Sequence, residues 1–415
     1  MTRVAGEILV GIDVGADGHQ VAIQAPDGSL IDELYIVHQH DNFDVLIKRL
    51  QALVDTHRAR VVVGIEGCNG YIAPFDQMLV AAGFEVLNIN PTRLYHFRRL
   101  YGAPYKNDSH DARLITGYLK ARGLLNLGDP ERRSLLPIKT GSDIHKRLRL
   151  LSRYLDELIR EQTRVRNRLT KRLKEYCPEL VALAKQVNRK WLLILLAHCS
   201  SIQSLQVMTV EEIKKLQGDT GYRIGPKKAV QIKHVVDAVD YCSPLNEEYA
   251  LILKNYALEL LRYAALITTT QVQIEQLGRD SVYYQLLLTQ PGIGVKLAGK
   301  MIGEILSINN FHSKDAFAAY NGTCCLDHKS GKRQESTTRN LLCNRRLQTA
   351  MRNWAGCRIR CHRSSRAYYE KKRNEGKRHN HALKCLSRQL SNLLYRRLKQ
   401  IESQAYELQL ISEAA

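Results

Sequence analysis

Four acidic residues near the start of the chain have the types and spacing of a metal site. Asp13 ends the apolar run EILVGID, and Glu66 ends a second run, RVVVGIE. Asp108 and Asp111 are three residues apart in KNDSHDARLI, so a helix there would place both on one face. Ionised carboxylates beside a core are costly unless they are paired or bind a cation. We therefore predict that these four residues bind Mg²⁺.

Carboxylate oxygens are hard ligands that suit Mg²⁺, and a pair of ions stabilises the attacking and leaving oxygens of phosphodiester transfer. We expect two Mg²⁺ ions and no organic cofactor. Each acid also has a structural interpretation: Asp13 could close a turn, Glu66 and Asp108 could cap helices, and Asp111 could favour a helix dipole. Four acids in this order favour the metal site over four separate structural roles.

The elements that would position these acids alternate between strands and helices over residues 7–125. Two alternating runs flank the Pro-Asp-Gly turn at 26–28, which indicates a hairpin. A helical pattern at 42–57, the run ending at Glu66, the strand FEVLNIN and helices from Pro91 to about Arg122 follow. Three strands in hairpin order and two more with helical crossovers predict an α/β domain with a ribonuclease H-like mixed sheet, in which Asp13 and Glu66 end neighbouring strands.

The middle of the chain carries two runs with the 3,4 spacing of a coiled-coil seam. The positions are Leu148, Leu151, Leu155, Leu158, Gln162, Val165, Leu169 and Tyr176, and then Leu253, Tyr256, Leu260, Tyr263, Ile267, Thr270, Ile274 and Leu277. A helical insert at about 178–245 separates them. The pattern predicts a long helical coiled-coil region, as an antiparallel arm or a dimerisation element, with packing inside one subunit as the alternative.

The remainder is predicted to be mostly α-helical. QPGIGVKLAGKMIGEIL resembles the second half of a helix-hairpin-helix, in which Gly292, Gly294 and Lys296 would hold a phosphate. A turn without that role fits the same residues. Residues 345–399 contain 17 Lys and Arg but only Glu370 and Glu375 as acids. This excess indicates nucleic-acid contact, for which Arg345 and Arg346 are candidates.

The whole-chain charge of +21 and the pI near 9.6 point to a polyanionic partner, most simply nucleic acid. A merely basic or ribosome-associated protein is the alternative, and an actin-like ATPase fits the charge poorly. The sequence has no apolar run of about 18 residues and no signal-peptide pattern, so we expect no membrane partner and a cytoplasmic, nucleoid-associated protein.

Cysteine and histidine gather late in the chain, in CRIRCH and HNHALKC. Cys357 and Cys361, like His381 and Cys385, are four residues apart, as one packed helix face would place them. The spacing differs from the C-x2-C pairs of common zinc modules. We interpret the cluster as core or solvated residues and all ten cysteines as reduced thiols.

One hydroxyl stands in a basic stretch, CLDHKSGKRQE. Ser330 is flanked by Lys329 and Gly331, with Lys332 and Arg333 next. It is either a turn residue in a basic loop or a nucleophile that reacts at phosphates, in which case Lys332 and Arg333 would bind flanking phosphates. A serine hydroxyl needs a base or a metal to react at neutral pH. No neighbouring residue is an obvious base, although His328, Lys329 and Lys332 are candidates by their proximity in the sequence. We expect the metal site to activate Ser330, which would require the two parts of the chain to meet.

The sequence resembles the DEDD transposases of the insertion sequence 110 group, also called bridge recombinases, over nearly its whole length. The resemblance depends on GIDVGADGHQVAI, GIEGCNGY, NPTRLYHFRR and KNDSHDARLI at the N-terminus. At the C-terminus it depends on QPGIGVKLAGKMIGEI, FHSKDAFAAYNG, KSGK, NRRLQTAM and ALKCLSRQLSNLLYRRL. The order and spacing of these motifs are more specific than any one of them.

The resemblance implies a domain at 1–130 like the Holliday-junction resolvase RuvC, an arm at 140–285 and a transposase domain at 286–415. It matches the family's metal ligands to Asp13, Glu66, Asp108 and Asp111, and the serine that forms a covalent phosphoserine link with DNA to Ser330. It further implies donor and target DNA, a structured guide RNA encoded by the element, and a homo-oligomer. The chain departs from the family by having a single serine in KSGK and Cys343 before Asn344.

Three functions therefore compete. The first is a transposase or recombinase that cuts and rejoins DNA through a Mg²⁺-assisted serine, guided by a bridge RNA. The second is a Mg²⁺-dependent junction resolvase or nuclease that uses water and needs no Ser330. The third is a non-catalytic nucleic-acid-binding scaffold, against which the four intact acids argue.

Overall fold

The structure is a computed structural model of the 415-residue chain. It describes residues 6–66, 70–100, 108–121, 135–137, 141–199, 201–218, 221–240, 244–328, 336–339 and 343–414. Within these, side chains are described except at 70, 108–109, 135–137, 325–328, 336–339 and 405–414. The chain divides into two compact units, Met1–Thr140 and Gly141–Ala415, which are treated separately below.

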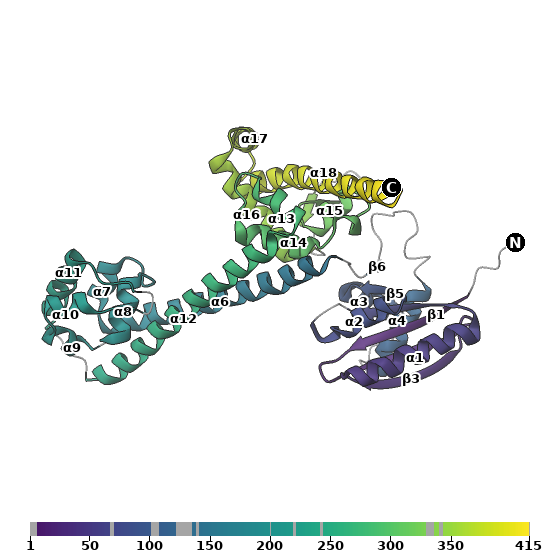
Figure 1. Cartoon of the computed structure of the whole chain (residues 1–415), viewed down its shortest axis with the longest axis horizontal. Coiled ribbons are helices and arrows are strands. Elements are labelled where there is room, and N and C mark those ends of the chain that lie inside the picture. Colours follow the sequence, from purple (N-terminus) through teal and green to yellow (C-terminus); the bar gives the residue numbers. More distant parts are fainter. Residues whose placement is uncertain are drawn as a thin grey trace. The chain divides into compact units, whose positions relative to one another are not determined.

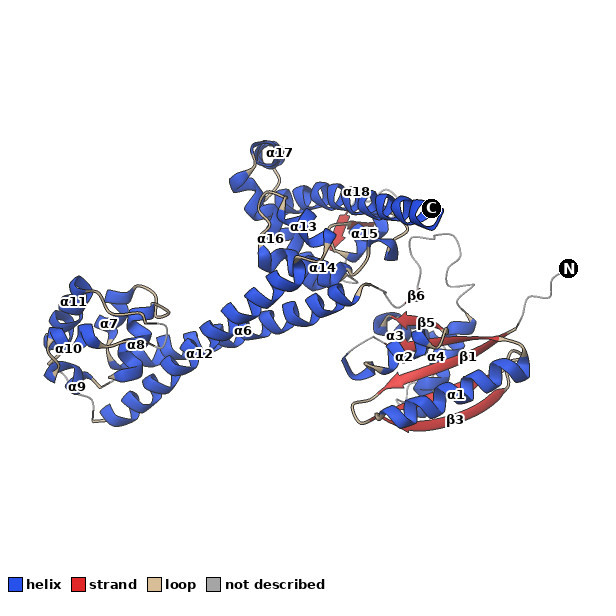
Figure 2. Cartoon of the chain, in the orientation of Figure 1, coloured by secondary structure: helices blue, strands red, loops and turns tan. Residues whose placement is uncertain are grey.

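The first unit contains a mixed sheet (Figures 1 and 2). Its described strands follow the order β3-β2-β1-β4-β5-β6. The strands are β1 (Glu7–Val14), β2 (Gly18–Gln24), β3 (Leu30–Val37), β4 (Arg60–Glu66), β5 (Glu85–Ile89) and β6 (Leu135–Pro137). β1, β4 and β5 are parallel, whereas β2, β3 and β6 each pair antiparallel with a neighbour. The predicted mixed sheet is confirmed. The short strand β6 was not predicted, because three residues are too few for a pattern.

Helices cover both faces of this sheet. They are α1 (His40–His57), α2 (Phe75–Ala81), α3 (Pro91–Leu100) and α4 (Asp108–Lys120), with the 3₁₀ turn η1 (Gly70–Ile72) before α2. Ile8, Val10 and Ile12 of β1 share a buried cluster with residues of α1 and α2. Leu9 instead shares a cluster with residues of α3 and α4. Alternate residues of a strand face opposite sides, so the odd-numbered residues of β1 face α3 and α4.

The second unit begins with a pair of long helices, α6 (Asp143–Tyr176) and α12 (Asn246–Gly278), which pack along each other (Figure 1). They run antiparallel, because Tyr176 at the end of α6 donates a hydrogen bond to Asn246 at the start of α12. Residues of both predicted seams are buried, among them Leu155 and Leu169 of α6 and Leu260 of α12. The seams therefore pack inside one chain, which was the predicted alternative to dimerisation.

Between the long helices lies a small helical module with its own buried core. Its helices are α7 (Pro178–Ala184), α8 (Lys190–His198), α9 (Ile202–Val207), α10 (Val210–Lys215) and α11 (Pro226–Asp237). The run KWLLILLAH forms α8, whose apolar residues face this core. In the described part of the chain, no helix is long and apolar enough to cross a membrane.

The rest of the second unit packs on the first half of α6 and the second half of α12. Trp354, Tyr284 and Phe317 are buried in the core formed there. Its helices are α13 (Val282–Leu288), α14 (Val295–Ile305), the 3₁₀ turn η3 (Ile308–Asn310), α15 (Lys314–Tyr320), α16 (Arg345–Cys361), α17 (Arg363–Asn374) and α18 (His379–Ala414). Strands β7 (Cys325–His328) and β8 (Ser336–Arg339) pair antiparallel between α15 and α16. The expectation of a mostly helical C-terminal part is confirmed.

Candidate functional site

Asp13 and Glu66 end two strands that lie side by side in parallel. Ile12 and Ile65 are register partners in the β1–β4 pair, so Asp13 and Glu66 follow them at the same level of the sheet. After their first residues, both strands consist of buried, uncharged residues up to that point. The sequence prediction that these two acids end neighbouring strands is therefore confirmed.

Two glycines let helix α4 lie directly on this part of the sheet. Gly11 and Gly64 are also register partners, two residues before Asp13 and Glu66. A Cβ atom on Gly11 would lie 2.1 Å from the carbonyl oxygen of Ala112, and one on Gly64 would lie 2.9 Å from Ile115. Since residues i and i+2 of a strand share a face, Asp13 and Glu66 are on the face that α4 covers.

Helix α4 runs opposite to β1 and so brings its first turn toward the strand ends. Lys120, its last residue, approaches Gly28 in the β2–β3 turn, near the beginning of β1. Arg113 forms an ion pair with Glu33 of β3, which is level with Gly11. Residues before Arg113 continue in the same direction, which places Asp111 and the backbone of Asp108 toward Asp13 and Glu66.

Asp111 is buried, with 2% of its surface exposed, and it has an ion pair with Arg98 of α3. The two atoms, Asp111 Oδ1 and Arg98 Nη2, are 2.7 Å apart, while Arg98 Nε is buried and has no acceptor among the described residues. Asp108 begins α4, but its side chain is outside the described set. Among the described side chains, no three acids, histidines or cysteines are grouped closely enough to bind a metal ion. This applies to the late Cys/His cluster as well.

The predicted nucleophile lies between β7 and β8 in the sequence. Ser330, Lys329, Lys332 and Arg333 are outside the described residues. The elements on either side are well anchored: Asn344 N donates to the Tyr320 carbonyl at 2.7 Å, and Asn344 Nδ2 donates to Tyr320 Oη at 2.9 Å. These bonds hold together the residues that precede β7 and follow β8.

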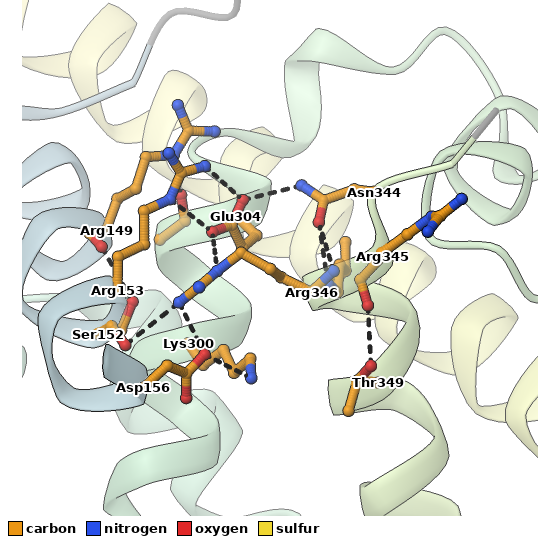
Figure 3. A network of polar contacts seen from close by, with 12 residues as sticks. Arg149, Ser152, Arg153, Asp156, Lys300, Glu304, Asn344, Arg345, Arg346 and Thr349 are labelled. Atoms are coloured by element: carbon orange, nitrogen blue, oxygen red, sulfur yellow. Dashed lines mark hydrogen bonds and ion pairs between the residues drawn. The ribbon is translucent and has the colours of Figure 1, made fainter. Parts of the chain in front are cut away.

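The same asparagine belongs to a polar network centred on Glu304 of α14 (Figure 3). Glu304 is fully buried, and its carboxylate accepts hydrogen bonds from Arg153 at 2.9 and 3.0 Å, Arg346 at 3.0 Å and Asn344 at 2.8 Å. Asn344 Oδ1 also caps α16 by accepting from Arg346 N and Leu347 N. Glu304 thus joins α6, α14 and the start of α16.

The charges of this network determine the ionisation of Glu304. Burial by itself would raise the pKa of Glu304, but the hydrogen bonds from Arg153 and Asn344 outweigh it and lower the pKa to about 2. Next to Glu304, Asp156 of α6 forms ion pairs with Lys300 at 2.8 Å and with Arg346 at 2.7 Å. Glu304 therefore stays ionised, and its ion pairs with Arg153 and Arg346 link α14 to α6 and α16.

The remaining predicted nucleic-acid contacts differ in accessibility. Gly292 has a φ of +85° in the turn between α13 and α14, which favours glycine. Gly294 precedes α14 with no side-chain cap, and Lys296 in the first turn is exposed. Arg345 is exposed, whereas Arg346 is engaged by Glu304 and Asp156. These positions stay predictions, with Arg346 committed to contacts inside the protein.

Sequence reasoning assigned no role to Arg98 or Glu304. Both had a visible signal: Arg98 lies within the motif NPTRLYHFRR, and Glu304 is an acid inside the apolar run MIGEIL. Neither signal identifies the partner, because Arg153 and Glu304 are 151 residues apart in the sequence.

Two family models match this chain. Residues 10–178 match a transposase model of the DEDD type of IS110, and residues 284–370 match the transposase IS116/IS110/IS902 family. The chain is therefore a transposase of an insertion sequence, a DNA-processing enzyme whose substrate is DNA. It belongs to the IS110 family, which confirms the resemblance found in the sequence.

Curated relatives cover the chain almost from end to end. The insertion element IS900 uncharacterized 42 kDa protein of Mycobacterium paratuberculosis is 24% identical over 403 residues, 95% of this chain and 96% of that protein. The insertion element IS116 uncharacterized 44.8 kDa protein of Streptomyces clavuligerus is 23% identical, covering 94% of both. Among solved structures, Thermus thermophilus RuvC in complex with a Holliday junction substrate is similar over 32% of this chain and 99% of RuvC, with 15% identity and a TM-score of 0.23.

Proposed function

We propose that this transposase cuts and rejoins DNA strands through Ser330, assisted by Mg²⁺ bound to Asp13, Glu66, Asp108 and Asp111. The observation that carries the proposal is the placement of Asp13 and Glu66 at register-matched strand ends on the face covered by α4. The helix direction brings Asp111 toward the same edge. Such an arrangement gathers negative charge beside a core, and a bound cation would neutralise it.

The donor set fits a hard divalent cation. Carboxylate oxygens are the ligands that Mg²⁺ takes in phosphoryl-transfer sites, and Asp111 has the burial expected of a ligand. Bound Mg²⁺ would neutralise the charge that develops on the phosphate. The family and the carboxylates support divalent-metal dependence, and the choice of Mg²⁺ and of two ions is part of the proposal.

A serine nucleophile accounts for rejoining as well as cutting. Ser330 Oγ attacks a DNA phosphorus and forms a phosphoserine ester; its proton passes to solvent or a base. The P–O bond to one deoxyribose breaks, and that oxygen leaves as a hydroxyl. A hydroxyl of the second DNA strand then attacks the phosphoserine, which restores the DNA linkage and frees Ser330. One phosphodiester is exchanged for another, so no external energy source is required.

We infer that the partners are donor DNA, target DNA and a structured RNA encoded by the element. The net charge of +21 supports extensive phosphate contact. Half-buried Gly292 and exposed Gly294 and Lys296 lie at a helix start without a side-chain cap, which suits a backbone phosphate. Strand exchange between two duplexes needs more than one Ser330, which favours a homo-oligomer acting on the nucleoid in the cytoplasm.

The same carboxylates would also serve a nuclease or junction resolvase that uses water. The two functions differ in Ser330 alone. With labelled donor and target DNA, guide RNA and Mg²⁺, we expect wild type to form an SDS-resistant protein–DNA adduct that alkali releases, as a phosphoserine ester requires. Ser330→Ala should still bind DNA but form no adduct and no recombinant product.

The control is Ser336→Ala, a serine of β8 six positions away, which should form the adduct as wild type does. DNA cleavage by Ser330→Ala with no adduct in either protein would identify the water-dependent nuclease. Binding without any cleavage by wild type would identify the non-catalytic scaffold.

A further inference from the structure

Arg358 of α16 is a buried cation to which the described side chains offer no carboxylate. Only 7% of the residue is exposed, and its Nη1 atom is buried with no hydrogen-bond acceptor in the described structure. Nε donates to the hydroxyl of Ser365 at 3.0 Å. An arginine stays charged in proteins, so an isolated buried guanidinium is unfavourable unless an anion completes it.

The surroundings of Arg358 supply more positive charge rather than a counter-ion. No described carboxylate forms an ion pair with it. Burial lowers the pKa of Arg358; the nearby Cys361 thiol opposes this, while the charge of Arg397 adds to it. The basic stretch 345–399 holds only two acids, Glu370 and Glu375. Glu375 is already paired with Lys372 and Lys377. The Trp354 ring, 5.6 Å from the guanidinium, offers a modest attraction that does not replace a full negative charge.

Arg358 is directed at the start of helix α17. Ser365, its hydrogen-bond partner, lies in the first turn of that helix, which has His362 as its N-cap and no acid in its first turn. The first intrahelical donor there is Arg366 N, which bonds the His362 carbonyl. The N–H groups of Arg363 and Ser364 precede it, so the helix itself gives them no acceptor. The positive end of the helix dipole adds to the charge of Arg358.

In the described structure, the acceptors at this junction, His362 Nδ1 and Ser365 Oγ, already receive hydrogen bonds, whereas N–H donors remain. His362 Nδ1 accepts from Ser365 N, and it lies 3.0 Å from Ser365 Oγ, so the hydroxyl donates to it. Ser365 Oγ can then accept from Arg358. With Nδ1 as acceptor, the ring proton of His362 is on Nε2, which is a further donor. A chain of donors around an unpaired cation is matched by an anionic oxygen ligand.

We propose that the junction of α16 and α17 binds one phosphodiester group of a nucleic-acid backbone, held by Arg358 and by the free N–H groups at the start of α17. The choice of nucleic acid depends on the proposed function, and the site is separate from both Ser330 and the carboxylates in sequence. Arg358 carries its charge in a buried position at a cost in stability, which gives the site a testable signature.

The test replaces Arg358 by methionine in the full chain and measures melting temperature and binding. In phosphate-free buffer, Arg358→Met should melt higher than wild type, because a buried unpaired charge is removed. Inorganic phosphate at constant ionic strength should raise the melting temperature of wild type and not of the variant. Affinity for nucleic acid should fall about ten-fold, and the slope of log K against log salt should fall by about one.

Two further variants separate a phosphate site from general effects. Arg352→Met removes an exposed charge from the same helix and should give no rise in melting temperature. Arg358→Lys should retain part of the binding, since a point charge replaces the planar fork. Duplex DNA and the structured RNA are assayed separately, and the polymer whose salt slope falls is the ligand.

A lower melting temperature of Arg358→Met with unchanged binding of both polymers would overturn the proposal and make Arg358 structural. Loss of the response to inorganic phosphate with both polymers unaffected would reduce the site to an adventitious ion only, and would also overturn it. Neither result depends on whether Ser330 forms an adduct, so the proposed function is tested independently.

Discussion

Glu304 and Asp111 are both buried carboxylates on helices, yet their surroundings differ. Glu304 receives hydrogen bonds on both oxygens from Arg153, Arg346 and Asn344. The described ion pair of Asp111 uses one carboxylate oxygen, Oδ1, and its partner is Arg98. A carboxylate whose lone pairs are filled by the protein stabilises the fold, while one with spare lone pairs can bind a cation. The comparison separates a structural acid from a candidate metal ligand without reference to sequence motifs.

The largest expected effect is on catalysis by the Asp111→Asn variant. Removing one ligand charge should lower the rate of adduct formation on the order of a thousand-fold, equivalent to about 4 kcal/mol of barrier. Mg²⁺ binding, followed by calorimetry, should weaken in the same variant. Retention of both the rate and the Mg²⁺ affinity would contradict the assignment of Asp111 and leave it a structural acid like Glu304.

The next effect is on stability, at Glu304. Glu304→Gln keeps the shape but turns an amide donor toward Arg153 and Arg346, and it should lower the free energy of unfolding by about 3 kcal/mol. Urea denaturation measures this directly. Glu157→Gln, an exposed acid on α6, should change stability by less than about 0.5 kcal/mol.

The pH dependence gives an independent check on the same residue. The pKa of Glu304 falls from 4.5 to about 2 on folding, so its contribution is complete above pH 4.5 and is lost as pH decreases toward 2. Over that range the wild type should approach Glu304→Gln in stability. If the difference in free energy of unfolding between the two proteins stays constant down to pH 2, the ionisation of Glu304 is not its source.

The sequence predicts part of this arrangement of acids. The placement of Asp13 and Glu66 at neighbouring strand ends was predictable, because long apolar runs define strands and the strand order makes their ends neighbours. The register-matched Gly11 and Gly64, which admit α4, were in the sequence without a visible function. Their role requires knowledge of which helix crosses which strands.

The Glu304 network depends entirely on tertiary contacts. Arg346 comes 42 residues after Glu304 in the sequence, and Arg153 comes 151 residues before it. Seam positions such as Leu155 and Leu260 had the same limit: periodicity predicted which face is buried, but the intrachain partner came from the structure. Local patterns specify faces and ends, while partner identity depends on how distant segments meet.

The smallest effect is expected on the stability of an Arg98 variant. Arg98→Met leaves the buried Asp111 carboxylate without its ion pair, which should lower the free energy of unfolding by about 2 kcal/mol in the absence of divalent ions. Mg²⁺ can supply the missing positive charge to Asp111. Its stabilising effect should therefore be greater in Arg98→Met than in wild type, as measured by the shift in melting temperature.

Two controls define the meaning of that shift. Asp111→Asn combined with Arg98→Met removes both charges, so Mg²⁺ should give it no greater stabilisation than wild type shows. Arg153→Met, in the second unit, removes a partner from Glu304, whose remaining donors leave no room for a cation, so Mg²⁺ should not restore its stability. If Mg²⁺ fails to rescue Arg98→Met, then Asp111 has no spare capacity for a metal, and the distinction between the two acids is lost.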